Sequence, residues 1–86
     1  AMRMSGTKPT RDNRVQWFLE GMIEHHGGAL QMAHEARKNS TNPTVRRLSR
    51  EIIFAQRKEI IRLRKMLQSK GINKPEYYKF DDLFWL

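Results

Sequence analysis

The sequence predicts an all-α protein built on an antiparallel two-helix hairpin, which pairs with a second copy of itself into a four-helix bundle. Apolar residues recur at steps of three and four in two stretches of similar length, and a short polar turn separates the stretches. The chain has only 86 residues and no cysteine. A domain of this size buries so little surface that its stability is marginal, and no disulfide stabilises it. We therefore expect a homodimer.

The first helix is predicted to run from about Asp12 to Lys38. Residues 1–11 show no apolar period and are predicted to be a disordered arm. Three glycines inside the helix each cost about 1 kcal/mol relative to alanine, so we expect close packing or open space beside them. The apolar side of this helix comprises Phe18, Leu19, Met22, Ile23, His26, Ala29, Leu30, Ala33 and Ala36.

The second helix is predicted to begin with Asn42 as the N-cap and Pro43 at the first helical position. It ends before Gly71, which suits a left-handed C-terminal cap. Residues 12–71 thus form the hairpin domain, and the aromatic tail 72–86 is predicted to pack on the hairpin or on the partner. The predicted apolar stripe of the second helix comprises Val45, Leu48, Ile52, Ala55, Glu59, Leu63 and Met66.

Several classes of function are not expected from this sequence. The absence of cysteine excludes a thiolate zinc site and a thiol nucleophile. The histidines lack the Glu-x-x-His spacing of di-iron carboxylate bundles and the His-Glu-x-x-His spacing of metalloproteases. No apolar run approaches the roughly 18 residues of a membrane span, so no transmembrane segment is expected. We expect the protein not to be an enzyme.

Two histidines and two methionines lie within three turns of the first helix. Met22 and His26 are four residues apart, and His25 and Met32 are seven apart on the flank of the same stripe. Imidazole and thioether ligands without thiolates favour copper, above all Cu(I). The alternative is that the methionines fill the core and the histidines are hydrogen-bonded core residues. His34 lies off the stripe and is predicted to be solvated.

The second helix places a carboxylate, Glu59, within its apolar stripe, with Gln56 one turn earlier. A buried carboxylate is costly unless it is paired, and across the hairpin its partners would be His25 or His26. Glu59 and Gln56 would then support the metal ligands. The other interpretation is a polar cluster that fixes the register of the helices and binds nothing.

The positive charge suggests a competing function. The chain has 17 Lys and Arg against 9 Asp and Glu, a net charge of +8. A basic surface for nucleic acid or anionic lipid is one alternative, and a solvated face is the other. No recognition-helix signature accompanies the charges, so specific nucleic-acid binding is not expected. The basic residues are predicted to surround the second helix outside its apolar stripe: Arg46, Arg47, Arg50, Arg57, Lys58, Arg62, Arg64 and Lys65.

The segment 22–33, Met-Ile-Glu-His-His-Gly-Gly-Ala-Leu-Gln-Met-Ala, resembles the domain of unknown function 305 family. The mark of that family is Met-Ile-x-His-His-x-x-Ala-x-x-Met-Ala. The segment 51–60, which contains Gln56 and Glu59, is similar to the family's second-helix pattern. Where members often carry further methionines, this chain has Leu19, Gly21 and Leu63.

The resemblance implies a ferritin-like helical bundle without enzymatic activity. Members are often bacterial proteins exported to the periplasm or the cell surface, and some are associated with copper. By motif position the implied ligands are Met22, His25, His26 and Met32, with Gln56 and Glu59 in support. We therefore expect a small dimeric domain that binds or buffers copper, the alternative being a structural or protein-interaction bundle without metal.

Overall fold

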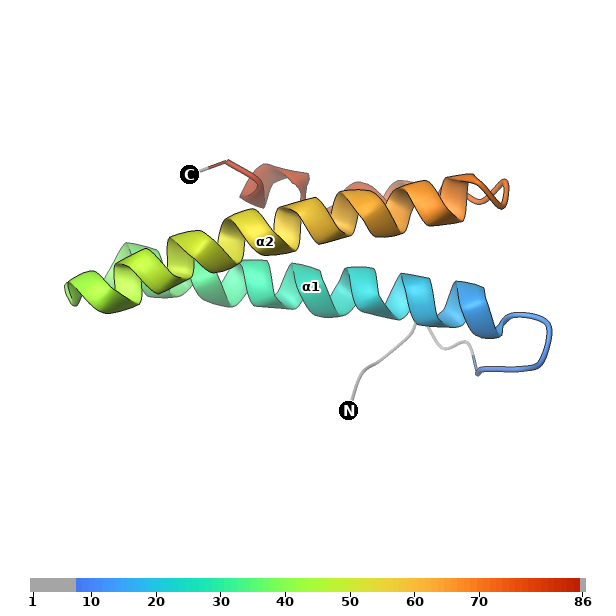
Figure 1. Cartoon of the computed structure of the whole chain (residues 1–86), viewed down its shortest axis with the longest axis horizontal. Helices are drawn as coiled ribbons and strands as arrows, with labels where there is room; N and C mark the ends of the chain where they lie inside the picture. Colours follow the sequence, from blue (N-terminus) through green and yellow to red (C-terminus); the bar gives the residue numbers. More distant parts are fainter. Residues whose placement is uncertain (1–7, 86) are drawn as a thin grey trace.

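The computed structural model describes residues 8–85 and consists of two long helices and a folded-back C-terminal segment (Figure 1). The long helices are α1 (Arg14–Asn39) and α2 (Pro43–Gln68). They lie antiparallel against each other and are followed by the short 3-10 helices η1 (Pro75–Tyr78) and η2 (Asp81–Leu83). The predicted all-α fold with two long packed helices is confirmed. Residues 1–7 of the predicted arm lie outside the described residues.

The ends of α2 follow local chemistry that the sequence displays. The side chain of Asn42 accepts hydrogen bonds from the backbone N–H groups of Thr44 and Val45, at 2.9 and 3.1 Å, and Pro43 begins the helix. At the other end Gly71 has a φ of +78°, and the N–H of Ile72 donates to the carbonyl oxygen of Leu67 at 3.0 Å. This is the expected left-handed cap.

The C-terminal segment, residues 72–85, runs back along the hairpin in contact with both helices (Figure 1). Its central contact is between the ring of Phe80 and the backbone of α1 at Gly27, where a Cβ atom would come within 3 Å of the ring. A Cβ at Gly28, one residue later, would meet nothing within 4 Å. The sequence suggested close packing or open space beside the glycines of this helix. Close packing occurs at Gly27, and open space occurs at Gly28.

Arg64 ties the C-terminal segment to α2. The residue is only 8% exposed, and Nη1 donates to Asp81 Oδ1 at 2.8 Å. Its guanidinium also lies 4.4 Å from the ring centroid of Tyr78 and 5.4 Å from that of Phe84. A buried cation requires such partners. The assignment of Arg64 to a basic outer surface was wrong, because the segment that covers it is distant in sequence.

Glu20 ties the same segment to α1. Its Oε2 accepts a hydrogen bond from Tyr77 Oη at 2.5 Å and forms an ion pair with Lys74 Nζ at 2.9 Å. Burial alone would raise the pKa of Glu20, but the hydrogen bonds from Tyr77, Lys74 and Gln16 outweigh it and hold the pKa below its ordinary value of 4.5. Burial and then the bond to Glu20 raise the pKa of Tyr77 above its ordinary range.

Another contact of the segment corrects the expectation that His34 is solvated. This residue is half-buried, and its Nε2 lies 2.5 Å from the carbonyl oxygen of Leu83. Glu24 pairs with Lys79 on the same side of α1, at 2.7 Å. The segment therefore follows α1 from its first turns to beyond its middle.

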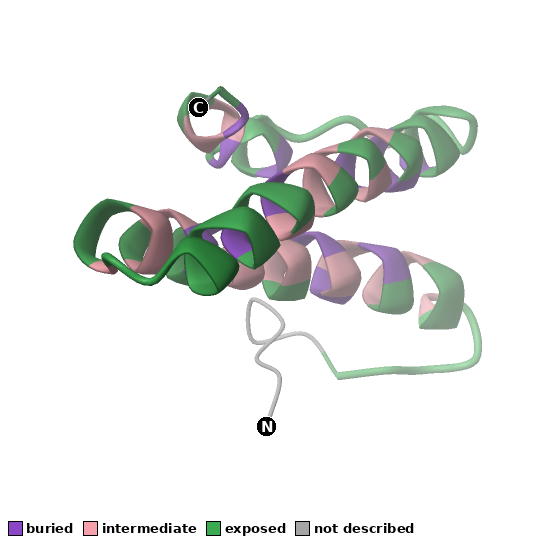
Figure 2. Ribbon diagram, turned by 60° about the vertical axis from the view of Figure 1, so that its left-hand side comes forward, coloured by how far each residue is buried: buried purple, intermediate pink, exposed green. Residues whose placement is uncertain are grey.

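The core lies between α1, α2 and the C-terminal segment, where Figure 2 shows the buried residues facing inward. The predicted stripe of α1 is buried in part, whereas in α2 only Leu63 of the seven predicted residues is buried. The observed core of α2 is rotated by roughly 80–90° from the predicted stripe, at about 100° per residue. The buried apolar residues are Leu19, Ile23, Leu30, Ala33, Ile53, Ile60, Leu63, Leu67, Tyr77, Phe80 and Phe84.

Two alanine substitutions test how the segment docks. Gly27→Ala should lower the free energy of unfolding by about 1–2 kcal/mol, because displacing a buried ring exceeds the gain in helix propensity. Gly28→Ala meets open space and should raise stability by about 0.5–1 kcal/mol. Urea denaturation followed by circular dichroism measures both. Equal effects at the two positions would contradict the docking of Phe80 on Gly27.

A second prediction concerns acid. Because the folded pKa of Glu20 is lowered, its contribution to stability is complete above the pKa of the unfolded chain and disappears as the pH falls through the folded value. Glu20→Gln should therefore be less stable at pH 7 and should lose less stability than the parent between pH 5 and pH 3. Glu51→Gln, at an exposed residue of α2, is the control and should keep the parent's slope. If stability changed with pH in the same way for the parent and both variants, the lowered pKa of Glu20 would be refuted.

Candidate metal site

A surface hollow of about 700 Å³ lies beside the middle of α1. It is lined by four of the six residues that the sequence singled out, three from α1 and one from α2: His25, His26, Met32 and Gln56. The chain passes from one helix to the other over only a short turn, so residues near the centres of both helices face each other. The hollow is therefore formed by both helices of the hairpin.

His26 carries the most informative atom of this hollow. Its Nδ1 is buried and has no hydrogen-bond partner within residues 8–85. Neither Gln56 nor Glu59 therefore bonds to this nitrogen. Buried polar atoms in folded proteins nearly always have a partner, so an unpaired buried imidazole nitrogen is unusual.

His25 and Met32 lie on the outer side of the same hollow. His25 is exposed, and the side chain of Met32 is 75% exposed, unusually high for an apolar residue. At about 100° per residue the two differ by only some 20° around α1, so they share a face two turns apart. His26 is displaced from His25 by about 100°, toward the core. The donors thus cover the hollow from its inner edge to its exposed flank.

Met22 and Glu59 are placed differently. Met22 packs against the hydrophobic core. Glu59 is half-exposed and forms an ion pair with Arg62 at 3.8 Å. In the single chain the structure thus brings His25, His26, Met32 and Gln56 to one hollow and gives Met22 and Glu59 other contacts.

The donor set restricts which metals the hollow suits. Among the described residues no three or more His, Cys, Asp or Glu side chains group so that they could hold a metal. Glu24 lines the hollow, but its carboxylate is already paired with Lys79. The donors that remain are neutral, namely imidazole nitrogen, thioether sulfur and an amide. They fit a soft ion such as Cu(I) and fit Mg²⁺ or Ca²⁺ poorly, since those ions prefer several oxygens.

Glu24 and Gly28 line the hollow but were not among the predicted site residues. With Met32 they follow one another at intervals of four residues and therefore lie along one side of α1. Gly28 contributes no side chain there, which helps to keep the space beside Met32 open. Attention to the four-residue spacing would have identified this side of the helix.

Comparison with known proteins identifies the family of the chain. Neither the curated proteins nor the solved structures that were compared with the chain include a match. The family described as domain of unknown function, DUF305, matches residues 15–79, which is 65 of the 86 residues and includes α1 except Arg14, all of α2 and the residues that line the hollow. The chain belongs to the DUF305 family.

Proposed function

We propose that the protein is a small non-enzymatic domain that binds or buffers copper as Cu(I). His25, His26 and Met32 would supply the ligands at the hollow, and Met22 would join them by turning away from the core. Gln56 would support the histidines. The observation that carries this proposal is the buried Nδ1 of His26, which lacks a hydrogen-bond partner in the described chain beside a hollow that contains further soft donors.

The exposure of the donors favours buffering over tight storage. Met32 is largely exposed and His25 is exposed, so an ion at these ligands would remain accessible to exchange. An enclosed site releases its ion slowly because the surrounding structure must first open. A site at the surface of a helix does not require that step.

We further propose that two chains pair through the exposed apolar side of the hairpin into a four-helix bundle. An apolar groove of about 280 Å³ lies between α1 and α2, lined by Ala29, Met32, Ala33, Ala36, Val45, Leu48, Ser49 and Ile52. Phe18 and Leu48 on this side are each 54% exposed. Large apolar residues exposed along one face are typical of an association surface.

The groove and the metal hollow adjoin, because Ala29 and Met32 line both. A partner chain on the groove would therefore cover part of Met32, whereas His25, which does not line the groove, would stay open to exchange. The dimer and the metal site are thus parts of one proposal.

An anaerobic Cu(I) titration against a chromophoric competitor tests the ligands. Met32→Leu conserves volume but removes the sulfur, so affinity should fall by roughly tenfold or more, as should the His25→Ala, His26→Ala double variant. Met66→Leu, at an exposed methionine of α2 away from the hollow, is the control and should bind normally. Unchanged affinity in every variant would show that the motif packs the bundle and binds no copper.

Analytical ultracentrifugation tests the dimer. At micromolar concentration the parent chain should sediment at twice 10.3 kDa, that is 20.6 kDa. Leu48→Glu places a charge on the groove and should yield a monomer of 10.3 kDa with its helices intact. Thr44→Glu, an exposed position that does not line the groove, should remain dimeric. A monomeric parent would exclude the four-helix assembly.

A further inference from the structure

The exposed side of α2 carries most of the positive charge of the protein. The helix contains eight basic and two acidic residues, so eight minus two gives it +6 of the total of +8. Four of the eight have a partner within the molecule: Arg46 donates to the backbone oxygen of Arg37, Arg64 is buried against Asp81, Arg57 donates to the backbone oxygen of Phe84, and Arg62 pairs with Glu59. The six other than Arg46 and Arg64 define what we call the basic face: Arg47, Arg50, Arg57, Lys58, Arg62 and Lys65.

The basic face occupies one side of α2, and one acidic residue, the exposed Glu51, lies within it. At about 100° per residue its six members fall within an arc of roughly 140° around α2, whereas the sequence analysis described the charges as surrounding the helix. Leu48 and Ile52, which line the apolar groove, lie more than about 100° around α2 from the centre of this arc. Pairing through the groove would therefore leave the basic face open in both chains.

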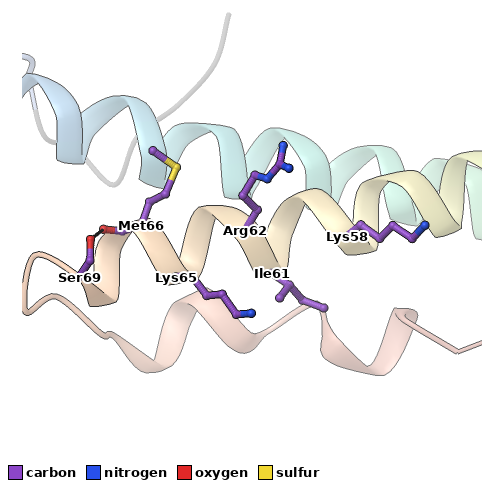
Figure 3. A pocket seen from close by; sticks show the side chains of 6 residues that line it. All are labelled: Lys58, Ile61, Arg62, Lys65, Met66 and Ser69. Carbon is purple, nitrogen blue, oxygen red and sulfur yellow. Dashed lines mark hydrogen bonds between the residues drawn. The ribbon is translucent and has the colours of Figure 1, made fainter.

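A hollow of about 400 Å³ lies on the C-terminal half of this face (Figure 3). Lys58, Arg62 and Lys65 line it together with the apolar side chains of Ile61 and Met66, and Ser69 lies at its end. Within residues 8–85 the structure gives Lys58 and Lys65 no ion pair. Cations beside apolar side chains suit a ligand with both a phosphate group and an apolar part.

Aromatic side chains lie beside the other half of the basic face. The guanidinium of Arg57 is 4.9 Å from the ring centroid of Phe54 and 5.4 Å from that of Trp85. Arg50 lies 5.8 Å from Phe54 as well. Because these ring faces are occupied by guanidinium groups, they are poor platforms for stacking nucleic-acid bases. Trp85 is 74% exposed, and exposed tryptophan beside basic residues is typical of membrane–water interfaces.

We propose that the basic face binds the surface of an anionic phospholipid bilayer. Lipid phosphates lie against Lys58, Arg62 and Lys65, glycerol and upper acyl groups contact Ile61 and Met66, and Trp85 enters the headgroup region. The contact is peripheral, since no helix among the described residues is long and apolar enough to cross a bilayer. This binding goes beyond the proposed copper function and does not depend on it.

Co-sedimentation with vesicles tests the proposal. The chain should bind vesicles of equal parts phosphatidylglycerol and phosphatidylcholine at low salt, and this binding should weaken at high salt. It should not bind vesicles of phosphatidylcholine alone. Each basic residue near such a surface contributes about fivefold to binding, so the Lys58→Gln, Arg62→Gln, Lys65→Gln variant should bind roughly 100-fold more weakly. The matched control removes three exposed cations elsewhere, by Arg11→Gln, Arg14→Gln and Lys38→Gln, and should keep most of the affinity.

Fluorescence supplies an independent readout. Trp17→Phe leaves Trp85 as the remaining tryptophan of the two in the chain, and its emission should shift to the blue when phosphatidylglycerol vesicles are added. Equal binding by the two triple variants would overturn the proposal, because net charge alone would then explain attraction. The absence of a blue shift would also overturn it, as would tighter binding to a single-stranded oligonucleotide than to vesicles at the same salt concentration.

Discussion

The contact between the ring of Phe80 and the backbone at Gly27 determines where the C-terminal segment lies on the hairpin. Any larger residue at position 27 would need the space that the ring occupies. With the ring in this position, Tyr77 bonds to Glu20 on α1 and Asp81 pairs with Arg64 on α2. Polar contacts to both helices thus flank the apolar contact of Phe80. Two helices alone have only each other as neighbours. The segment gives them a third surface, and it allows a chain without cysteine to enclose a core.

The same contact determines what remains uncovered. The segment reaches the middle of α2, where the backbone oxygen of Phe84 accepts from Arg57 at 3.1 Å. The first turns of α2 therefore have α1 alone beside them, and Figure 2 shows that end of the hairpin as mostly exposed. The apolar groove lies in this part of the molecule, on a different side from the segment. A partner that covered the groove would complete a core that the segment encloses only on its own side.

The features of the fold that depend on contacts within a few residues could be predicted from the sequence. Asn42 and Gly71 set the ends of α2 through hydrogen bonds within a few residues, and both ends agree with the prediction. The core face of α2 was not predictable in this way. The helix has apolar residues on two sides, and periodicity alone cannot decide which side faces α1. The buried side of α2 also contacts residues far away in the sequence, as Arg64 does with Asp81. Of the predicted site residues, His25, His26, Met32 and Gln56 line one hollow, whereas Met22 packs on the core and Glu59 pairs with Arg62.

The four residues from His25 to Gly28 form one motif in the sequence but point to four sides of α1, since each step turns by about 100°. His25 is exposed, His26 carries a buried ring nitrogen, Gly27 lies under Phe80, and Gly28 borders open space. Because Gly27 is fixed against the segment, the rotation of α1 is fixed as well. That rotation holds His26 at the inner edge of the hollow and keeps the space beside Gly28 free. The placement of the candidate site on α1 is therefore coupled to the docking of a segment that contributes no residue to the hollow.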